Sequence, residues 1–181
     1  MLFAMMQIKA IKTRVFKEHE DLIKFILQYV KKIPKKSILV ITSKIVALSE
    51  GRTAFNKSKK VFLIKKESNT AVKTGDTWLT VKDGMFMAAA GIDESNADGK
   101  LTLLPKDSYK SAESVRRVLQ RKFKLKKLGV LITDSGFLPM RSGAVGLALG
   151  YSGFKGIRNY IGKKDIFGRV LKVSRTCLLY T

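Results

Sequence analysis

The spacing of apolar side chains predicts two amphipathic helices. Over residues 18–32, apolar side chains recur every three or four positions and therefore fall on one face of a helix. Acidic residues open this segment, lysines close it and Pro34 follows, an order that favours a helix ending near residue 32. A second helix is predicted over residues 108–123, with Ser108 as its cap. The two apolar faces comprise Leu22, Phe25, Ile26, Tyr29 and Val30, and Ala112, Val115, Val118, Leu119 and Phe123.

Apolar runs rich in β-branched residues predict the strands. Residues 37–47, SILVITSKIVA, and residues 129–133, GVLIT, each indicate one buried strand. Residues 77–82 and 85–89 flank the dipeptide Asp-Gly, which is a strong signal for a hairpin. A short strand over residues 101–104 ends at Pro105.

The remaining segments have weaker patterns. Residues 7–13 alternate loosely, as in a strand, residues 61–73 are ambiguous, and residues 143–156 are rich in glycine. Basic connections are expected over residues 56–60 and 122–127. Because strands outnumber helices and the two alternate, the pattern predicts an α+β or mixed α/β class, with mixed or antiparallel sheets and a few helices.

Composition narrows the chemistry of any site. Hydrophobic residues make up 45% of the 181 residues, which is enough for a sizeable core. The single cysteine, Cys177, can form no internal disulfide. The chain also has only one histidine, His19, so it lacks the ligands of a structural zinc site. A bound metal would need oxygen ligands, as Mg, Mn or Ca do. No apolar run approaches the roughly 20 residues of a membrane span, so we expect a cytoplasmic protein that does not bind membranes.

The formal net charge of +22 indicates attraction for anions. Nucleic acid is one such partner, and phosphorylated or polycarboxylate small molecules are another. The basic residues are spread over the chain and match no nucleic-acid-binding motif, so nucleic acid is the weaker hypothesis. A lysine-rich surface produced by the codon usage of a genome is an equally simple explanation.

Two aspartates follow apolar runs directly. Asp93 comes after MFMAAAGI and Asp134 comes after GVLIT. Carboxylates at the mouths of strands meet where ligands usually bind, and Ser135 and Asn96 would add neutral oxygens around one or two hard cations. The alternative is that both aspartates cap turns of their own backbone.

The sequence contains no established phosphate-binding loop. Ser43 and Lys44 are expected within the strand over residues 37–47, where Lys44 either contacts phosphate or faces solvent. The glycines of residues 143–156 allow either close approach to an anion or tight packing between backbones. The chain offers no Ser/His/Asp triad, because its one histidine lies in an acidic segment.

As a set, these motifs resemble the coenzyme F-420-0:L-glutamate ligase family. VITSKIVALSEGR, AGIDESNADGKLTLLPKDSYKSAESVRRVL, GVLITDSGFLPMRSGAVGLALGYSGFKG and GKKDIFGRVLKV occur in the order and at about the spacing of that family, over residues 37–173. The resemblance implies an unusual α+β fold, a homodimer, and a ligase that joins L-glutamate to an acceptor carboxylate with GTP (or ATP), Mg or Mn and often K⁺.

The resemblance also implies roles for individual residues. Asp93, Asp134 and Ser135 would ligate metal, while Ser43 and Asn96 would contact the nucleotide. The basic residues Lys44, Arg52 and Arg141 would neutralise phosphates, glutamate and the anionic acceptor. We expect Arg52 to act at the nucleotide, and Lys44 and Arg141 to act in catalysis.

Some positions depart from the family's pattern. Leu48 stands where a lysine is common, residues 137–138 replace a Gly-Arg, and residues 159–162 read Asn-Tyr-Ile-Gly instead of Asp-Tyr-Arg-Gly. We expect a single ligase-like domain over residues 1–181 that lacks the family's C-terminal segment. The alternatives are a ligase acting on another acceptor, such as the glutamate tail of a peptide, and a non-catalytic relative.

Overall fold

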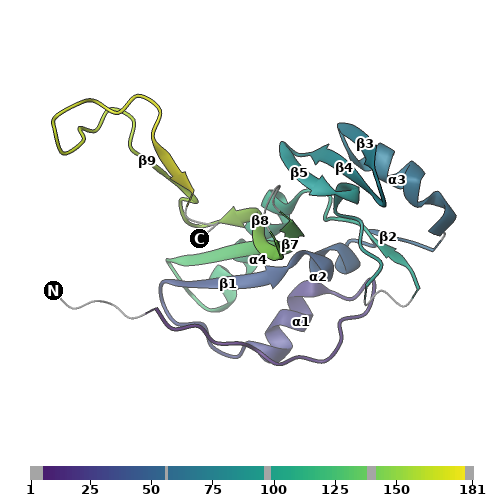
Figure 1. Cartoon of the computed structure of the whole chain (residues 1–181). Coiled ribbons are helices and arrows are strands. Elements are labelled where there is room, and N and C mark those ends of the chain that lie inside the picture. The colour runs from purple at the N-terminus through teal and green to yellow at the C-terminus, as the bar shows by residue number, and fades with distance from the viewer. Residues whose placement is uncertain (1–5, 56, 96–98, 138–141, 178–181) are drawn as a thin grey trace.

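The central part of the fold is a three-stranded mixed sheet with helices packed against it. The computed structural model describes residues 6–55, 57–95, 99–137 and 142–177. β1 (Ser37–Thr42) runs parallel to β7 (Leu128–Phe137), and β8 (Ala144–Ser152) pairs antiparallel with β7 on its other side. The helices α1 (Leu22–Tyr29), α2 (Ser43–Ser49) and α4 (Ser108–Lys122) lie beside this sheet (Figure 1). Each contributes apolar side chains to the core.

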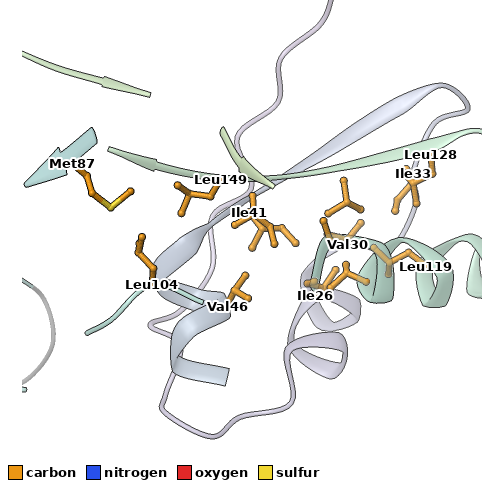
Figure 2. Packing of buried hydrophobic residues seen from close by; sticks show 14 residues of the cluster. Ile26, Val30, Ile33, Ile41, Val46, Met87, Leu104, Leu119, Leu128 and Leu149 are labelled. Atoms are coloured by element: carbon orange, nitrogen blue, oxygen red, sulfur yellow. The ribbon is translucent and has the colours of Figure 1, made fainter. Parts of the chain in front are cut away.

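One apolar cluster joins this sheet to its helices. Figure 2 shows Ile26 of α1, Val30 just after it, Ile41 of β1 and Leu119 of α4 pointing toward one another. Burial of such side chains is the main favourable term in folding, which explains why the two predicted helical faces were readable in the sequence.

A second, antiparallel sheet lies beside the first. It consists of β3 (Thr70–Thr74), β4 (Thr77–Lys82) and β5 (Met85–Ala88), and α3 (Lys60–Glu67) covers it after a short turn of 3₁₀ helix, η1 (Lys57–Lys59). A smaller apolar cluster of Ile64, Ile92, Leu101 and Leu103 joins these parts. The short strands β2 (Thr53–Ala54) and β6 (Leu101–Thr102) pair antiparallel, and η2 (Ala89–Gly91) leads out of β5.

The last described segment forms an extended hairpin. β9 (Ile157–Asn159) and β10 (Arg175–Cys177) pair antiparallel, and Figure 1 shows the hairpin, in yellow, projecting away from the two sheets. Its turn residues Ile166 and Phe167 are 92% and 89% exposed. No helix among the described residues is long and apolar enough to cross a membrane.

The α+β class is confirmed, as are the hairpin around Asp83-Gly84 and the helix after Pro105. In α4 the capping residue is Asp107 rather than Ser108, because the Asp107 carboxylate accepts from the backbone N–H of Lys110 at 2.9 Å.

The boundaries of other elements were predicted wrongly. The first helix spans Leu22–Tyr29 rather than 18–32, because Asp21 caps it and the backbone of Val30 is extended. The predicted strand over residues 37–47 ends at Thr42, where α2 begins. The strand over residues 129–133 continues to Phe137 through an irregularity in register between Ile132 and Thr133.

The structure also shows what the segments with weaker sequence patterns form. Residues 7–13 form no strand, and residues 61–73 contain most of α3 and the start of β3. Lys57–Lys59 is helical rather than a loop, while Asn56 lies outside the described residues. The glycine-rich segment contains β8, so its short apolar pieces belong to one strand.

Gly150 allows α4 to pack directly on β8. A Cβ at this position would lie 2.6 Å from both the Ser108 carbonyl oxygen and the Tyr109 nitrogen, so here glycine serves close backbone packing. We expect Gly150→Ala to lower the free energy of unfolding by about 1–3 kcal/mol in urea titrations, since two backbone segments must separate. Gly146→Ala on the same strand, where a Cβ meets nothing within 4 Å, is the matched control. Equal stabilities for the two variants would contradict this explanation.

Candidate functional site

A cavity of about 730 Å³ lies where the two sheets approach each other. Most of its lining comes from α2, β5, η2, β7 and β8, together with the segments before α1 and after η2. The elements β1, β4 and α3 contribute one residue each. One part of the lining is apolar, and it includes Phe16, Ile45, Leu48 and Leu149. The polar part consists of Thr42, Lys44, Lys60, Thr77, Asp93, Ser95, Asp134 and Ser135.

Asp134 faces this cavity from within β7. The parallel pairing of Thr42 with Thr133 places Ser43, the first residue of α2, beside it. The buried Ser43 hydroxyl donates to Oδ1 of Asp134 at 2.8 Å. Burial raises the pKa of Asp134, and the negative charge of Asp93 acts in the same direction, while the hydrogen bond from Ser43 opposes both.

Asp93 reaches the cavity from a strained turn. Ala89, Ala90 and Gly91 all have positive φ angles of 49–71°, a conformation that alanine rarely adopts. The buried Thr80 hydroxyl accepts from the Ala90 N–H at 2.9 Å, and the backbone of Asp93 then pairs with Thr102 in both directions. Strained backbone of this kind is held only where neighbours fix it, and it is often found at functional sites.

The Asp93 carboxylate is held in its ionised form. Its oxygens accept from the Lys44 ammonium at 2.5 Å and from the backbone N–H and hydroxyl of Ser95, both at 2.8 Å. Burial works against the charge, but these hydrogen bonds outweigh it and keep the pKa of Asp93 below its ordinary value. The carboxylate is therefore ionised at neutral pH.

Lys44 is the centre of a small oxygen cage. Besides Asp93, its Nζ donates to the Ser95 carbonyl at 2.7 Å and to the Ser95 hydroxyl at 3.2 Å. Lys44 was predicted within a strand, but it stands in the first turn of α2, and this placement turns its side chain toward the segment 93–95. The ammonium thus occupies a position surrounded by oxygen atoms, as a metal ion would be.

The donor set fits a hard divalent cation. Asp93 and Asp134 face one cavity, the charge of Asp93 raises the cost of ionising Asp134, and Ser135 adds a hydroxyl to the lining. Among the described residues no group of three or more His, Cys, Asp or Glu side chains gathers, so two carboxylates are what this part of the chain offers. Mg²⁺ typically uses one or two carboxylates and completes its coordination with water and substrate phosphates.

The structure brings together most of the predicted site residues. Lys44, Asp93, Asp134 and Ser135 line the cavity, and Ser43 is bonded to one of them. Asp134 lies inside a strand rather than after one, because β7 continues past the expected end. Asn96 and Arg141 lie outside the described residues.

Arg52 lies away from this group. Its guanidinium bonds Glu67 at 2.6 Å and the Leu104 carbonyl at 3.0 Å, and Arg52 is absent from the described cavity lining. Lys60, in contrast, lines the cavity and was not predicted. In the sequence, Lys60 lies in a segment that was predicted to be a basic loop. Recognising that α3 begins at Lys60 would have indicated that its side chain has a defined place in the fold.

Comparisons with known proteins agree on one family. The family model described as F420-0:Gamma-glutamyl ligase matches residues 10–179. A coenzyme F420:L-glutamate ligase of Methanococcus maripaludis is 38% identical over 161 residues, which are 87% of this chain and 64% of that protein. Enzymes of the same name from Methanocaldococcus jannaschii and Archaeoglobus fulgidus are 38% and 34% identical, over 66% and 91% of this chain. The chain spans 49% and 73% of the length of those two relatives.

Proposed function

The chain belongs to the F420-0:gamma-glutamyl ligase family, and on that premise we propose that it is a nucleotide-dependent ligase that joins L-glutamate to an acceptor carboxylate. The observation that carries the proposal is the meeting of Asp93 and Asp134 with Lys44 in one cavity. Opposite charges placed in this way suit a reaction between anionic substrates, in which negative charge must be neutralised.

The proposed reaction has two steps. A carboxylate is a poor electrophile, so an acceptor carboxylate oxygen first attacks the γ-phosphorus of GTP or ATP, which forms an acyl phosphate and releases the nucleoside diphosphate. The α-amine of glutamate then attacks the acyl carbon, inorganic phosphate leaves and the amine loses a proton. The product is an amide between the acceptor and L-glutamate.

The residues have separate tasks in this scheme. Asp93, Asp134 and Ser135 would hold Mg²⁺ or Mn²⁺, and the Ser43 hydroxyl fixes the orientation of Asp134. When bound, the cation would neutralise charge on the phosphate oxygens. Lys44 lies in reach of the same place and would contact phosphate as a point charge. The family resemblance also implies a requirement for K⁺, to which we assign no binding residues.

We also propose that the chain forms a homodimer. Ile38 and Val40 on the outer face of β1 are exposed apolar side chains, and the projecting β9–β10 hairpin exposes Ile166 and Phe167. Exposed apolar surface of this kind favours association with another protein surface. A second copy would cover it without requiring any other partner.

Glutamate transfer tests the proposal directly. The chain is incubated with GTP or ATP, Mn²⁺, L-glutamate and one acceptor, either the coenzyme precursor F420-0 or a peptide that ends in glutamate. We expect equal amounts of nucleoside diphosphate and of an acceptor whose mass has increased by one glutamyl residue. Omitting glutamate should abolish the glutamylated product. Failure with both acceptors and both nucleotides would contradict the proposal.

A further inference from the structure

Two lysines reach the polar part of the cavity from different helices. Lys44 comes from α2, and Lys60 is the first residue of α3. The Nζ atom of Lys60 lies 2.6 Å from Oε1 of Glu94, the residue next to Asp93. Both ammonium groups therefore hold the same short segment, residues 93–95.

The charges on this lining are balanced. Among the described residues, the charged side chains that line the cavity are Lys44, Lys60, Asp93 and Asp134. A divalent cation on the two carboxylates, as proposed above, would cancel their charge and leave two ammonium groups, of which the one on Lys60 faces Glu94 just outside the lining. The polar part of the cavity would then attract an anion.

The ion pair between Lys60 and Glu94 is easily exchanged. The two side chains are 35% and 38% exposed, and ion pairs that solvent reaches contribute little to stability. The lysine ammonium is a compact charge on a flexible stem, so it can change partners without rearrangement of the helix. A phosphate group that enters the cavity offers it a charge-assisted hydrogen bond of the same kind as the one it makes to Glu94.

We propose that Lys60 is a second anion-binding residue of this cavity. Glu94 holds its ammonium group while no ligand is bound, and the ammonium moves to a phosphate of the polyphosphate chain when a nucleotide enters. The inference rests on the proposed function for the identity of the anion, and on the contacts of Lys60 for its place. It makes Lys60 a substrate-binding residue rather than part of a surface ion pair.

Binding of inorganic triphosphate tests this role. Titration calorimetry with the full chain, at one fixed Mg²⁺ concentration, compares the wild type with Lys60→Met and Lys60→Arg. We expect about 10-fold weaker binding for Lys60→Met, the loss of one charge-assisted hydrogen bond, and less than about 3-fold for Lys60→Arg, which keeps the charge. Lys110→Met, which removes an exposed lysine paired with Asp107, should bind like the wild type.

Glu94→Gln separates the binding role from a structural one. If the role of Glu94 toward Lys60 is to pair with its ammonium group until a ligand binds, this variant binds triphosphate at least as tightly as the wild type. If the pair is a structural brace, Glu94→Gln weakens binding as much as Lys60→Met does, and the inference is overturned. Equal binding by Lys60→Met and Lys110→Met overturns it too. Should Lys60→Met fail to fold, the triphosphate affinities of Lys60→Arg and Glu94→Gln still distinguish a binding role of Lys60 from a structural one.

The assay contains neither glutamate nor an acceptor. A chain that binds triphosphate through Lys60 but forms no amide therefore contradicts the ligase proposal alone. A chain that forms the amide while Lys60→Met binds triphosphate normally contradicts only the role of Lys60.

Discussion

Replacing Asp93 by asparagine is expected to lower the rate of glutamate ligation by about 100- to 1000-fold, because a preorganised charge at the reacting phosphates is lost. Asparagine has the shape of aspartate and its side-chain oxygen can still accept from Ser95, so the strained turn is retained. What disappears is the negative charge that Lys44 now neutralises at 2.5 Å. Steady-state release of nucleoside diphosphate in the presence of glutamate measures the effect.

A second measurement shows whether the lost activity comes from lost metal. Mn²⁺ binding, followed by electron paramagnetic resonance without any nucleotide, should weaken by at least about 10- to 100-fold in Asp93→Asn, because even removal of a residue that only supports a metal ligand costs that much affinity. Asp83→Asn is the matched control, since Asp83 is an exposed aspartate at a positive φ angle in the β4–β5 turn. Wild-type activity in Asp93→Asn would remove this carboxylate from the reaction.

The parts of the fold that were predictable are those set by local patterns. The helix α4 carries its apolar residues at helical spacing, and Asp-Gly dictates the tight turn between β4 and β5. The meeting of Asp93 and Asp134 could also be anticipated, because each follows an apolar run that enters the core. Periodicity and turn chemistry act over a few residues, so a single sequence displays them.

Other features depend on contacts between distant residues. The sequence shows little of where the strand β1 gives way to the helix α2, since β-branched residues lie on both sides of Thr42-Ser43-Lys44. In the structure, Val46 and Ala47 of the helix are buried. Arg52 was expected at a nucleotide, but its nearest acid in space, Glu67, is 15 residues away in sequence. Lys60 joins the cavity only because α3 packs beside η2. Such pairings become visible only in three dimensions.

Replacing Glu67 by glutamine is expected to lower the free energy of unfolding by about 3 kcal/mol, because the buried Lys82 and the partly buried Arg52 would lose their common partner. The Glu67 carboxylate accepts from Arg52 at 2.6 Å and from Lys82 at 2.8 Å, and the side chains of Glu67 and Lys82 are only 13% and 11% exposed. These contacts join the turn after α2 to the end of α3 and to β4. Urea denaturation of the variant and of the wild type at pH 7 measures the difference.

A matched control is Glu20→Gln, whose partner Arg14 is 45% exposed. This ion pair at 2.9 Å should contribute no more than about 1 kcal/mol. If Glu20→Gln and Glu67→Gln lower the free energy of unfolding by the same amount, burial is not what makes Glu67 important.

The pH dependence of the Glu67 effect follows from the direction of its pKa. Burial opposes ionisation of Glu67, but the hydrogen bonds from Lys82 and Arg52 outweigh it and lower the pKa below its ordinary value of 4.5. The stabilisation is therefore complete above pH 4.5 and is lost as the pH falls through the lowered pKa of the folded state. Glutamine cannot ionise, so the difference in the free energy of unfolding between the wild type and Glu67→Gln should narrow steadily below pH 4.5. A difference that stays constant from pH 7 to that acidic range would mean that Glu67 stabilises the fold by packing rather than by charge.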